Sequence, residues 1–238
     1  MKAGTGAATA ALALAAVVAT SAGAATDSER PPCEPEGSVT LARSHETRVY
    51  QIERRRNERA TLYTYGCHRA TGTQVLLASD AEPAALFPRP AISLRGPYVG
   101  YAVDTDTEPA EPGGRMTYVE VDDLRPQDPD SETVGLVASA GPRRVARVGS
   151  LKVSPRGAVA WIACPAPRDN PLAADPSGQC KRPGANNRVY RARLTRAGVT
   201  RVELLDRGRS IDPASLRRAR DGRVAWRKGS RTGTAKLR

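Results

Sequence analysis

One short pattern recurs along the 238-residue chain: a turn containing glycine is followed by a short apolar strand that ends in an aromatic residue. The clearest copy is Ser-Pro-Arg-Gly-Ala-Val-Ala-Trp at 154–161, and Ala-Arg-Asp-Gly-Arg-Val-Ala-Trp at 219–226 repeats it. The segment 94–101 is a weaker copy, and 44–50 is a degenerate one. Self-similarity at a period of tens of residues is typical of repeat architectures, so this pattern constrains the fold class most strongly.

The aromatic residues that close these copies are Tyr50, Tyr101, Trp161 and Trp226, at successive spacings of 51, 60 and 65 residues. Aromatic residues make up only 4% of the chain, so the few present are expected to anchor the core. A sugar-stacking platform is the alternative role for the two tryptophans. Their fixed position in the repeat favours the core.

The strand in the clearest copy is apolar on both faces, because Val159 and Trp161 point one way and Ala160 the other. Such a strand is expected to be covered on both sides. The segment 188–194 instead alternates apolar residues with arginines, which is typical of a strand with one buried and one solvated face. No long segment shows helical periodicity. We therefore predict an all-β fold of antiparallel sheets.

Residues 38–238 are expected to form a single domain of four units: 38–80, 91–139, 150–206 and 213–238. The expected strands are 39–42, 48–52, 60–67 and 73–78; 91–94, 98–103, 116–121 and 133–138; 150–153, 158–163, 188–194 and 199–205; and 214–218, 223–227 and 232–237. Turns are expected at 53–59, at 69–72 and at Asp221-Gly222, a type I′ hairpin signal. A linker at 82–90, an acidic loop at 104–115, a basic connector at 141–149 and a long loop at 165–187 complete the chain.

The Ser-Pro-x-Gly-x-Val-Ala-Trp motif at 154–161 resembles the inner-strand motif of TolB-type and WD-like β-propeller repeats. The chain is also similar to a family of secreted β-propeller-like proteins of high-GC bacteria. In that family an N-terminal Cys precedes a Leu-Tyr-x-x-x-Cys strand, as at 62–67, and a Trp strand and an Ala-x-Leu strand come last, as at Trp226 and 235–237. The resemblance covers most of residues 33–238. It implies export and a β-propeller-like fold of about four blades, either a closed ring or an open partial propeller. It implies no activity, because propellers host many functions.

The N-terminus is expected to be a secretory signal peptide, residues 1–24. A short basic start precedes a weakly apolar Ala-rich run at 7–20, and Ala22-Gly23-Ala24 is a small-x-small cleavage signal. Cleavage between Ala24 and Ala25 would leave a polar tail at 25–37 and a secreted, extracytoplasmic protein without a transmembrane segment. An uncleaved anchor is the alternative, although the apolar run is short for a membrane span.

The four cysteines agree with export, because an even number in an oxidising compartment suggests two disulfides. Three pairings are possible. Proximity in sequence favours Cys164–Cys180, which leaves Cys33–Cys67. A zinc site is less favoured, because no Cys-x-x-Cys occurs and the two histidines are not at ligand spacing. No metal or cofactor is expected.

Charge divides the chain into two unlike halves. Residues 25–132 carry 12 Arg and no Lys against 19 acidic residues, whereas 133–238 carry 20 Arg and 4 Lys against 6. The basic half predicts binding to an anionic polysaccharide or other cell-envelope polymer, because Arg forms bidentate hydrogen bonds to phosphate and carboxylate. A solvated Arg-rich surface, or neutralisation by the acidic half, is the alternative; nucleic acid is disfavoured by export. The candidate anion-binding residues lie in two dense runs: Arg143, Arg144 and Arg147, and Arg217, Arg218 and Arg220.

Catalytic motifs are missing from the sequence: there is no Gly-x-Ser-x-Gly elbow, His-Glu-x-x-His pair, phosphate loop or dinucleotide fingerprint. We therefore expect a non-catalytic binding or scaffold module and name no catalytic residue. The alternative is a polysaccharide hydrolase or lyase, for which Glu120, Asp122 and Asp123 are the available carboxylates. Glu120 and Asp122 share one strand face, but such pairs are common on solvated faces. The carboxylates of the 104–115 loop are expected to be solvated rather than to bind calcium.

Overall fold

The computed structural model describes residues 33–56, 59–79, 84–85, 91–106, 115–126, 138–139, 146–165, 186–195, 198–199 and 202–237. All of the regular secondary structure in these ranges is β-strand, and every strand pairing is antiparallel. The predicted all-β antiparallel class is confirmed. The described ranges contain no helix that is long and apolar enough to cross a membrane.

The strands form four sheets, each built from strands that are consecutive in the chain. Sheet 1 contains β1 (Val39–Arg43), β2 (Thr47–Arg56), β3 (Arg59–His68) and β4 (Thr73–Ser79); sheet 2 contains β5 (Ala84–Ala85), β6 (Ile92–Arg95), β7 (Tyr98–Asp106), β8 (Arg115–Asp123) and β9 (Ala138–Ser139). Sheet 3 contains β10 (Ala146–Val153), β11 (Ala158–Pro165), β12 (Asn187–Thr195), β13 (Gly198–Val199) and β14 (Glu203–Gly208); sheet 4 contains β15 (Arg217–Arg218), β16 (Arg223–Lys228) and β17 (Arg231–Lys236).

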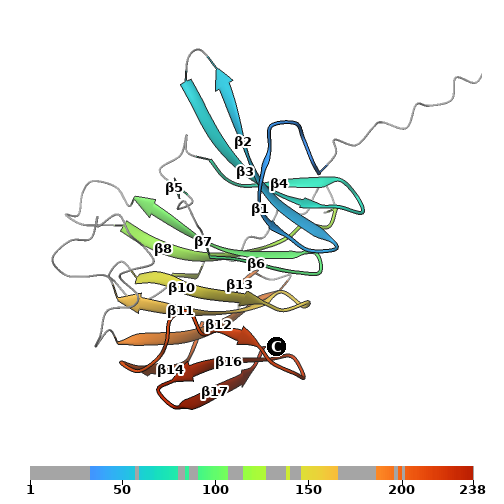
Figure 1. Ribbon diagram of the computed structural model, residues 1–238. Coiled ribbons are helices and arrows are strands. Elements are labelled where there is room, and N and C mark those ends of the chain that lie inside the picture. The colour runs from blue at the N-terminus through green and yellow to red at the C-terminus, as the bar shows by residue number, and fades with distance from the viewer. Residues whose placement is uncertain are drawn as a thin grey trace, which may run out of the picture.

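The sheets are layered in chain order, with sheet 1 at the top of Figure 1 and sheet 4 at the bottom. Three apolar clusters fill the spaces between successive sheets. Val49 of sheet 1 packs with Val99 and Val103 of sheet 2, and Val121 of sheet 2 packs with Trp161 of sheet 3. Ala160 and Ile162 on the other face of β11 pack with Val224 and Trp226 of sheet 4. The strand β11 is therefore covered on both faces, as its sequence predicts.

The four aromatic anchors occupy equivalent places in the four sheets. Tyr50, Tyr101, Trp161 and Trp226 lie on β2, β7, β11 and β16. Each of these strands pairs with the strand just before it in the chain, and we call those preceding strands, β1, β6, β10 and β15, the opening strands. Their exposed fractions are 1%, 2%, 0% and 4%. The core role predicted for both tryptophans is confirmed, and the sugar-stacking alternative is wrong because neither indole reaches the surface.

The turns that precede two of these strands explain the glycine in the repeat. Gly157 has a φ of 75°, and Ser154 closes its turn by accepting hydrogen bonds on Oγ from the backbone N–H groups of Arg156 and Ala158. Asp221 and Gly222 have φ angles of 59° and 66°. Positive φ at two consecutive central residues is what a type I′ turn requires, so the hairpin predicted there is confirmed.

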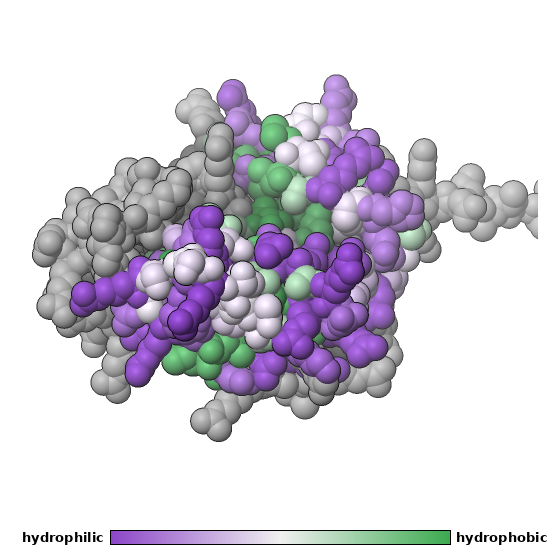
Figure 2. Space-filling view, turned by 60° about the horizontal axis from the view of Figure 1, so that its bottom comes forward, coloured by the Kyte–Doolittle hydropathy of each residue, from purple (hydrophilic) through white to green (hydrophobic). Residues whose placement is uncertain are grey.

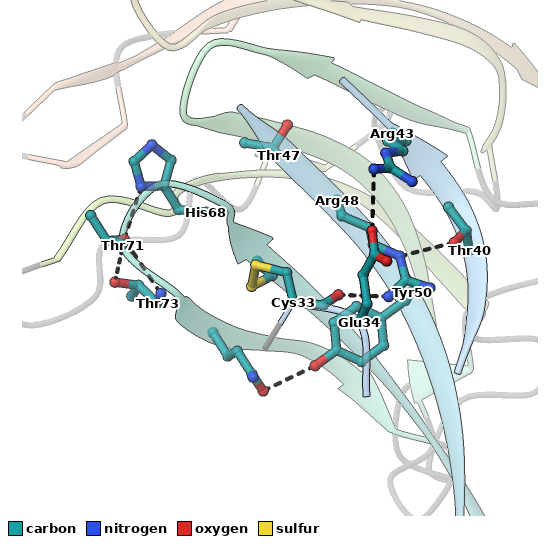
Figure 3. The surroundings of a disulfide bond; sticks show 12 residues. Cys33, Glu34, Thr40, Arg43, Thr47, Arg48, Tyr50, His68, Thr71 and Thr73 are labelled. Atoms are coloured by element: carbon teal, nitrogen blue, oxygen red, sulfur yellow. Dashed lines mark hydrogen bonds and ion pairs between the residues drawn. A yellow bond between two sulfur atoms is a disulfide. The ribbon is translucent and has the colours of Figure 1, made fainter. Parts of the chain in front are cut away.

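The predicted Cys33–Cys67 disulfide is present, with a Cα–Cα distance of 5.7 Å. It fixes the start of the described chain against the face of sheet 1 that carries Tyr50 (Figure 3). Arg48 lies beside it, donating from Nη1 to the carbonyl oxygen of Cys33 at 2.6 Å and from Nε to Thr40 Oγ1 at 2.9 Å. The guanidinium also lies 5.0 Å from the centroid of the Tyr50 ring, so a buried arginine joins the N-terminal segment to the sheet.

Several predicted boundaries are wrong because charged residues continue strands that were expected to end. The run 53–59 was expected to be a turn, but β2 continues to Arg56 and β3 begins at Arg59. Arg54 lies over the rings of Tyr63 and Tyr65, which gives the charged segment an aromatic surface to cover. Likewise β10 begins at Ala146 inside the expected basic connector, and β7 extends into the expected acidic loop as far as Asp106.

Some predictions concern residues outside the described ranges. These are the signal peptide, the tail before Cys33, most of the 165–187 loop and most of the predicted strand at 133–138. Cys164 is disulfide-bonded, but its predicted partner Cys180 lies outside the described residues. In the acidic loop, the structure describes only the backbone of 104–106 and Arg115.

Candidate anion-binding site

Arg218 connects three sheets. It lies at the end of β15 in sheet 4, and its Nε donates to the carbonyl oxygen of Val153 in sheet 3 at 3.3 Å. Its Nη2 donates to the carbonyl oxygen of Leu94 at 2.7 Å and to Ser93 Oγ at 3.2 Å, both in sheet 2. The guanidinium therefore lies where the opening strands β6, β10 and β15 come together.

Close packing of β6 and β7 against β10 makes this meeting possible. The backbone N–H of Val153 donates to Ser93 Oγ at 3.1 Å. Gly100 faces Leu151 so closely that a Cβ on Gly100 would lie 3.0 Å from Leu151 Cδ2. The lack of a side chain at Gly100 thus lets sheets 2 and 3 approach, and the ends of their opening strands come within reach of one arginine.

Two further cations stand beside the backbone groups that Arg218 contacts. Arg95 is the last residue of β6 and follows Leu94, and Lys152 precedes Val153 at the end of β10. Lys152 faces the sheet 4 side, because its neighbours Leu151 and Val153 belong to the cluster against sheet 2. We call Arg95, Lys152 and Arg218 the basic cluster.

The charges of this cluster repel one another. Burial and the positive charge of Arg218 lower the pKa of Lys152, and burial and the positive charge of Arg95 lower the pKa of Arg218. In the described part of the chain no carboxylate forms an ion pair with any of the three. By contrast, Arg191 pairs with Glu203 and Lys228 with Asp206. An anion bound at the basic cluster would relieve an uncompensated repulsion.

Only one of the six predicted anion-binding residues belongs to the basic cluster. Arg218 is there, although its Nε and Nη2 are already engaged by backbone and Ser93 oxygens. Arg217 and Arg220 lie outside the cluster, on β15 and in the turn after it, and both are exposed, as Arg218 is. Arg143 and Arg144, and the side chain of Arg147, lie outside what the structure describes.

Sequence reasoning missed Arg95 and Lys152 because it searched for dense arginine runs. The repeat itself contained the signal. Each of the four opening strands has a cation at its last or next-to-last residue: Arg43, Arg95, Lys152 and Arg218. Arg43 differs in forming an ion pair with Glu34.

Hydrophilic side chains dominate the face seen in Figure 2, which looks toward the lower end of the stack in Figure 1. Hydrophobic surface is confined there to a central strip and a small lower patch. The solvated Arg-rich surface expected as the alternative therefore also exists, and Arg209, Arg217 and Arg231 are exposed members of it. The basic cluster differs from these residues in lying where sheets 2, 3 and 4 meet.

The carboxylates considered for hydrolysis lie elsewhere. Glu120 and Asp122 project from β8 toward sheet 1, and the Tyr101 hydroxyl lies within hydrogen-bond distance of both, 2.7 Å from Glu120 Oε2 and 2.8 Å from Asp122 Oδ2. Asp122 is 5% exposed, so the prediction of a solvated pair is wrong. The shared face is confirmed. Burial was not foreseen because sheet 1 covers this face, and β8 shows no sign of that contact in its own sequence.

The two histidines lie at or beside turns between strands. His68 Nδ1 lies 2.9 Å from Thr71 Oγ1 in the turn between β3 and β4, and His45 is exposed in the turn after β1. Ser44 accepts a hydrogen bond on Oγ from the backbone N–H of Thr47 at 3.0 Å. The Ser-His-Glu sequence at 44–46 is therefore part of a turn closed by Ser44.

Comparison with known proteins does not assign the chain to a family: no protein-family model matches it, and no curated protein matches it.

Proposed function

We propose that this protein is a non-catalytic, extracytoplasmic binding module, and that the basic cluster is where it engages an anionic polymer of the cell envelope. The ligand class would be a polymer bearing carboxylate, sulfate or phosphate groups. A single observation carries the proposal: three cations from three different sheets meet without a carboxylate partner in the described part of the chain.

The chemistry of the cluster suits an oxyanion. Lys152 offers an ammonium group with three donors, and Arg95 offers a planar guanidinium that matches an oxyanion with two parallel hydrogen bonds. Arg218 would contribute mainly its charge, because it holds the backbones of sheets 2 and 3 in place. Strands rather than loops position all three, which favours a preformed site.

The proposal includes a propeller-like arrangement of the sheets. Four observations support it: the sheets follow chain order, each contains an opening strand paired with the strand that follows it, that following strand carries the aromatic anchor, and three opening strands meet at Arg218. Sheets 1 and 4 lie at opposite ends of the stack in Figure 1, which favours an open partial propeller over a closed ring. The Cys33–Cys67 disulfide is compatible with an extracytoplasmic location.

Retention on sulfated and phosphorylated matrices over a series of salt concentrations tests the proposed partner, with neutral dextran as the background. Polyanion binding weakens with added salt, because counterions compete and screen. We expect the double variant Arg95→Gln, Lys152→Gln to elute at lower salt than the unaltered protein. The matched control is Arg209→Gln, Arg231→Gln, which removes the same charge from exposed positions outside the basic cluster.

A larger loss from the control pair than from the cluster pair would contradict the proposed site while leaving polyanion binding intact. Equal retention of the unaltered protein on the charged and neutral matrices would contradict the polymer itself. A third double variant, Arg217→Gln, Arg220→Gln, measures the contribution of the exposed arginines predicted from sequence.

A polysaccharide hydrolase or lyase is the second candidate, because paired carboxylates line a pocket. Their placement favours binding over hydrolysis. Glycosidases hold two carboxyl groups on either side of the scissile bond, whereas Glu120 and Asp122 project from one strand and bind the same hydroxyl. Release of reducing or unsaturated ends from a panel of acidic polysaccharides, lost in Asp122→Asn, would favour the enzyme.

A further inference from the structure

A pocket of about 480 Å³ lies between sheets 1 and 2, apart from the basic cluster. Four consecutive residues of β4, Gln74 to Leu77, form one wall, and Tyr101, Glu120 and Asp122 form the other. This volume is within the range of pockets that bind small molecules or a single side chain. One wall is largely apolar, and the other presents two carboxylates.

The polar wall offers a single hydroxyl hydrogen, that of Tyr101, to two carboxylates. The hydroxyl of Tyr101 lies within hydrogen-bond distance of both Glu120 and Asp122, but it carries a single hydrogen to donate. At any moment one carboxylate therefore lacks that donor, and the described residues provide no other donor and no cation to either group. Asp122 lines the pocket while being only 5% exposed, so water reaches it poorly.

Burial of this uncompensated charge is costly. Burial raises the pKa of both carboxyl groups, and the charge of Asp122 further raises that of Glu120. Burial and the two neighbouring carboxylates also raise the pKa of Tyr101 well above its ordinary value, so the tyrosine stays a neutral donor. An added proton or a cation in the pocket would compensate this buried charge.

We propose that this pocket binds an alkylammonium group, such as a lysine side chain or the terminal amine of a small ligand. An ammonium group has three N–H donors, enough to reach both carboxylates while Tyr101 keeps its own hydrogen bond. Val75 and Leu77 on the opposite wall offer apolar surface to the methylene stem of such a group.

A metal ion fits the pocket less well. Hard cations such as Ca²⁺ take six to eight oxygen ligands, and the β4 wall supplies mostly apolar side chains. Among the described residues no group of three or more His, Cys, Asp or Glu side chains is placed to hold a metal. The apolar wall and the paired carboxylates together select an organic cation.

Titration of the oxidised full chain with n-pentylammonium, 1-pentanol and Ca²⁺, followed by NMR chemical shifts, tests this proposal. The first two probes share a stem and differ in charge. We expect saturable shifts at residues 74–77, 101 and 118–122 with n-pentylammonium alone. Equal binding of 1-pentanol would show that the charge pair is not the recognition element, and saturable binding of Ca²⁺ alone would assign the pocket to a metal. Either result overturns the proposal.

Isosteric variants test whether the carboxylate pair, Glu120 and Asp122, is the binding site. Asp122→Asn and Glu120→Gln should each weaken n-pentylammonium binding by about tenfold or more, because each removes one charged acceptor. Glu53→Gln, an exposed glutamate on β2 paired with Arg55, is the matched control and should leave binding unchanged. If Asp122→Asn does not fold, the less buried Glu120→Gln keeps the test decisive. Unchanged affinity in a folded variant refutes the site.

Affinity should also fall as the pH is lowered through the raised pKa values of the pair, because protonated carboxyl groups no longer attract the cation. The aliphatic amine stays charged throughout this range. Sheet 1 faces the pair with Gln74, Val75, Leu76 and Leu77, none of which titrates, and Tyr101 is the remaining titratable group of the lining. A pH-independent affinity would contradict the proposal.

Discussion

The indole Nε1 of Trp226 donates to Asp206 Oδ2 at 2.9 Å. Its counterpart in the preceding repeat, Trp161, is fully buried, and its Nε1 has no hydrogen-bond partner among the described residues. Two tryptophans at equivalent positions of the repeat therefore stabilise the core in different ways. Trp161 acts through packing, including a stacked contact with Tyr190 at a centroid distance of 5.5 Å, and Trp226 acts through packing and a polar contact.

Trp161→Ala should lower the free energy of unfolding by about 3–5 kcal/mol, because it leaves a large cavity between sheets 2 and 3. Chemical denaturation followed by far-ultraviolet circular dichroism measures this. Trp161→Phe is the companion variant and should cost less than Trp226→Phe, which leaves Asp206 without its indole donor. The reverse order would contradict the assigned roles.

Reducing the Cys33–Cys67 disulfide should lower stability by about 3–4 kcal/mol on the loop-closure model, since the two cysteines are 34 residues apart. The double variant Cys33→Ser, Cys67→Ser isolates this bridge from the bond at Cys164. A change below about 1 kcal/mol would mean that Arg48 and its contacts hold the N-terminal segment without the covalent link.

Gly222→Ala should destabilise the protein by about 1–2 kcal/mol, because a φ of 66° strains any residue with a Cβ. No atom lies within 4 Å of the position that the new Cβ would take, so the loss measures backbone strain alone. A thermal melt compares it with Asp221→Gly, which relieves strain at a φ of 59° but adds disorder to the unfolded chain. A neutral Gly222→Ala would argue against the type I′ turn.

The carboxylate pair should make the protein less stable as the pH rises. The folded pKa values of Glu120 and Asp122 are raised above the ordinary values of 4.5 and 3.8, so the folded state binds more protons than the unfolded state between the ordinary and raised values. Stability is lost across that window and stays lower above it. Asp122→Asn should therefore raise the melting temperature at neutral pH and lose this advantage in acid. A gain that is the same at both pH values would refute the linkage.

Lys152→Met should raise the melting temperature while weakening retention on polyanion matrices, because it removes a half-buried charge that Arg218 repels. Sulfate or phosphate should stabilise the unaltered protein more than this variant at equal ionic strength. Equal stabilisation of both proteins would indicate a general salt effect and would argue against an anion at the basic cluster.

Local sequence patterns predicted most strands, the turns at 69–72 and at Asp221-Gly222, and the anchors. The strand expected at 199–205 corresponds to β13 and β14, and the one expected at 214–218 is only the two residues of β15. Val159, Ala160 and Trp161 carry the two-sided apolar pattern of a covered strand, and Asp221-Gly222 carries its own turn signal. These features depend on residues that are close in the chain. The boundaries at Arg56 and Ala146 were wrong because a contact from another strand or sheet decided whether a charged residue stays in a strand.

The candidate sites were harder to predict for the same reason. Arg218 and Ser93 are 125 residues apart, and no pattern within either segment indicates that they meet. Burial of Asp122 depends on the covering sheet 1. The equivalent cations at the ends of the opening strands were visible in the sequence, but their meaning depends on the distance between strand ends, which only the stacking of the sheets determines.

The chain-order layering has a consequence for the proposed export of this chain. If the polypeptide emerges from a membrane pore N-terminus first, sheet 1 can fold before sheet 2 has left the pore. Each later sheet can then pack against the exposed face of the sheet before it. Arg218 enters after β6 and β10 and joins strands that are already in place. The basic cluster would therefore be completed late in translocation, when β15 has crossed and only the last two strands of sheet 4 remain.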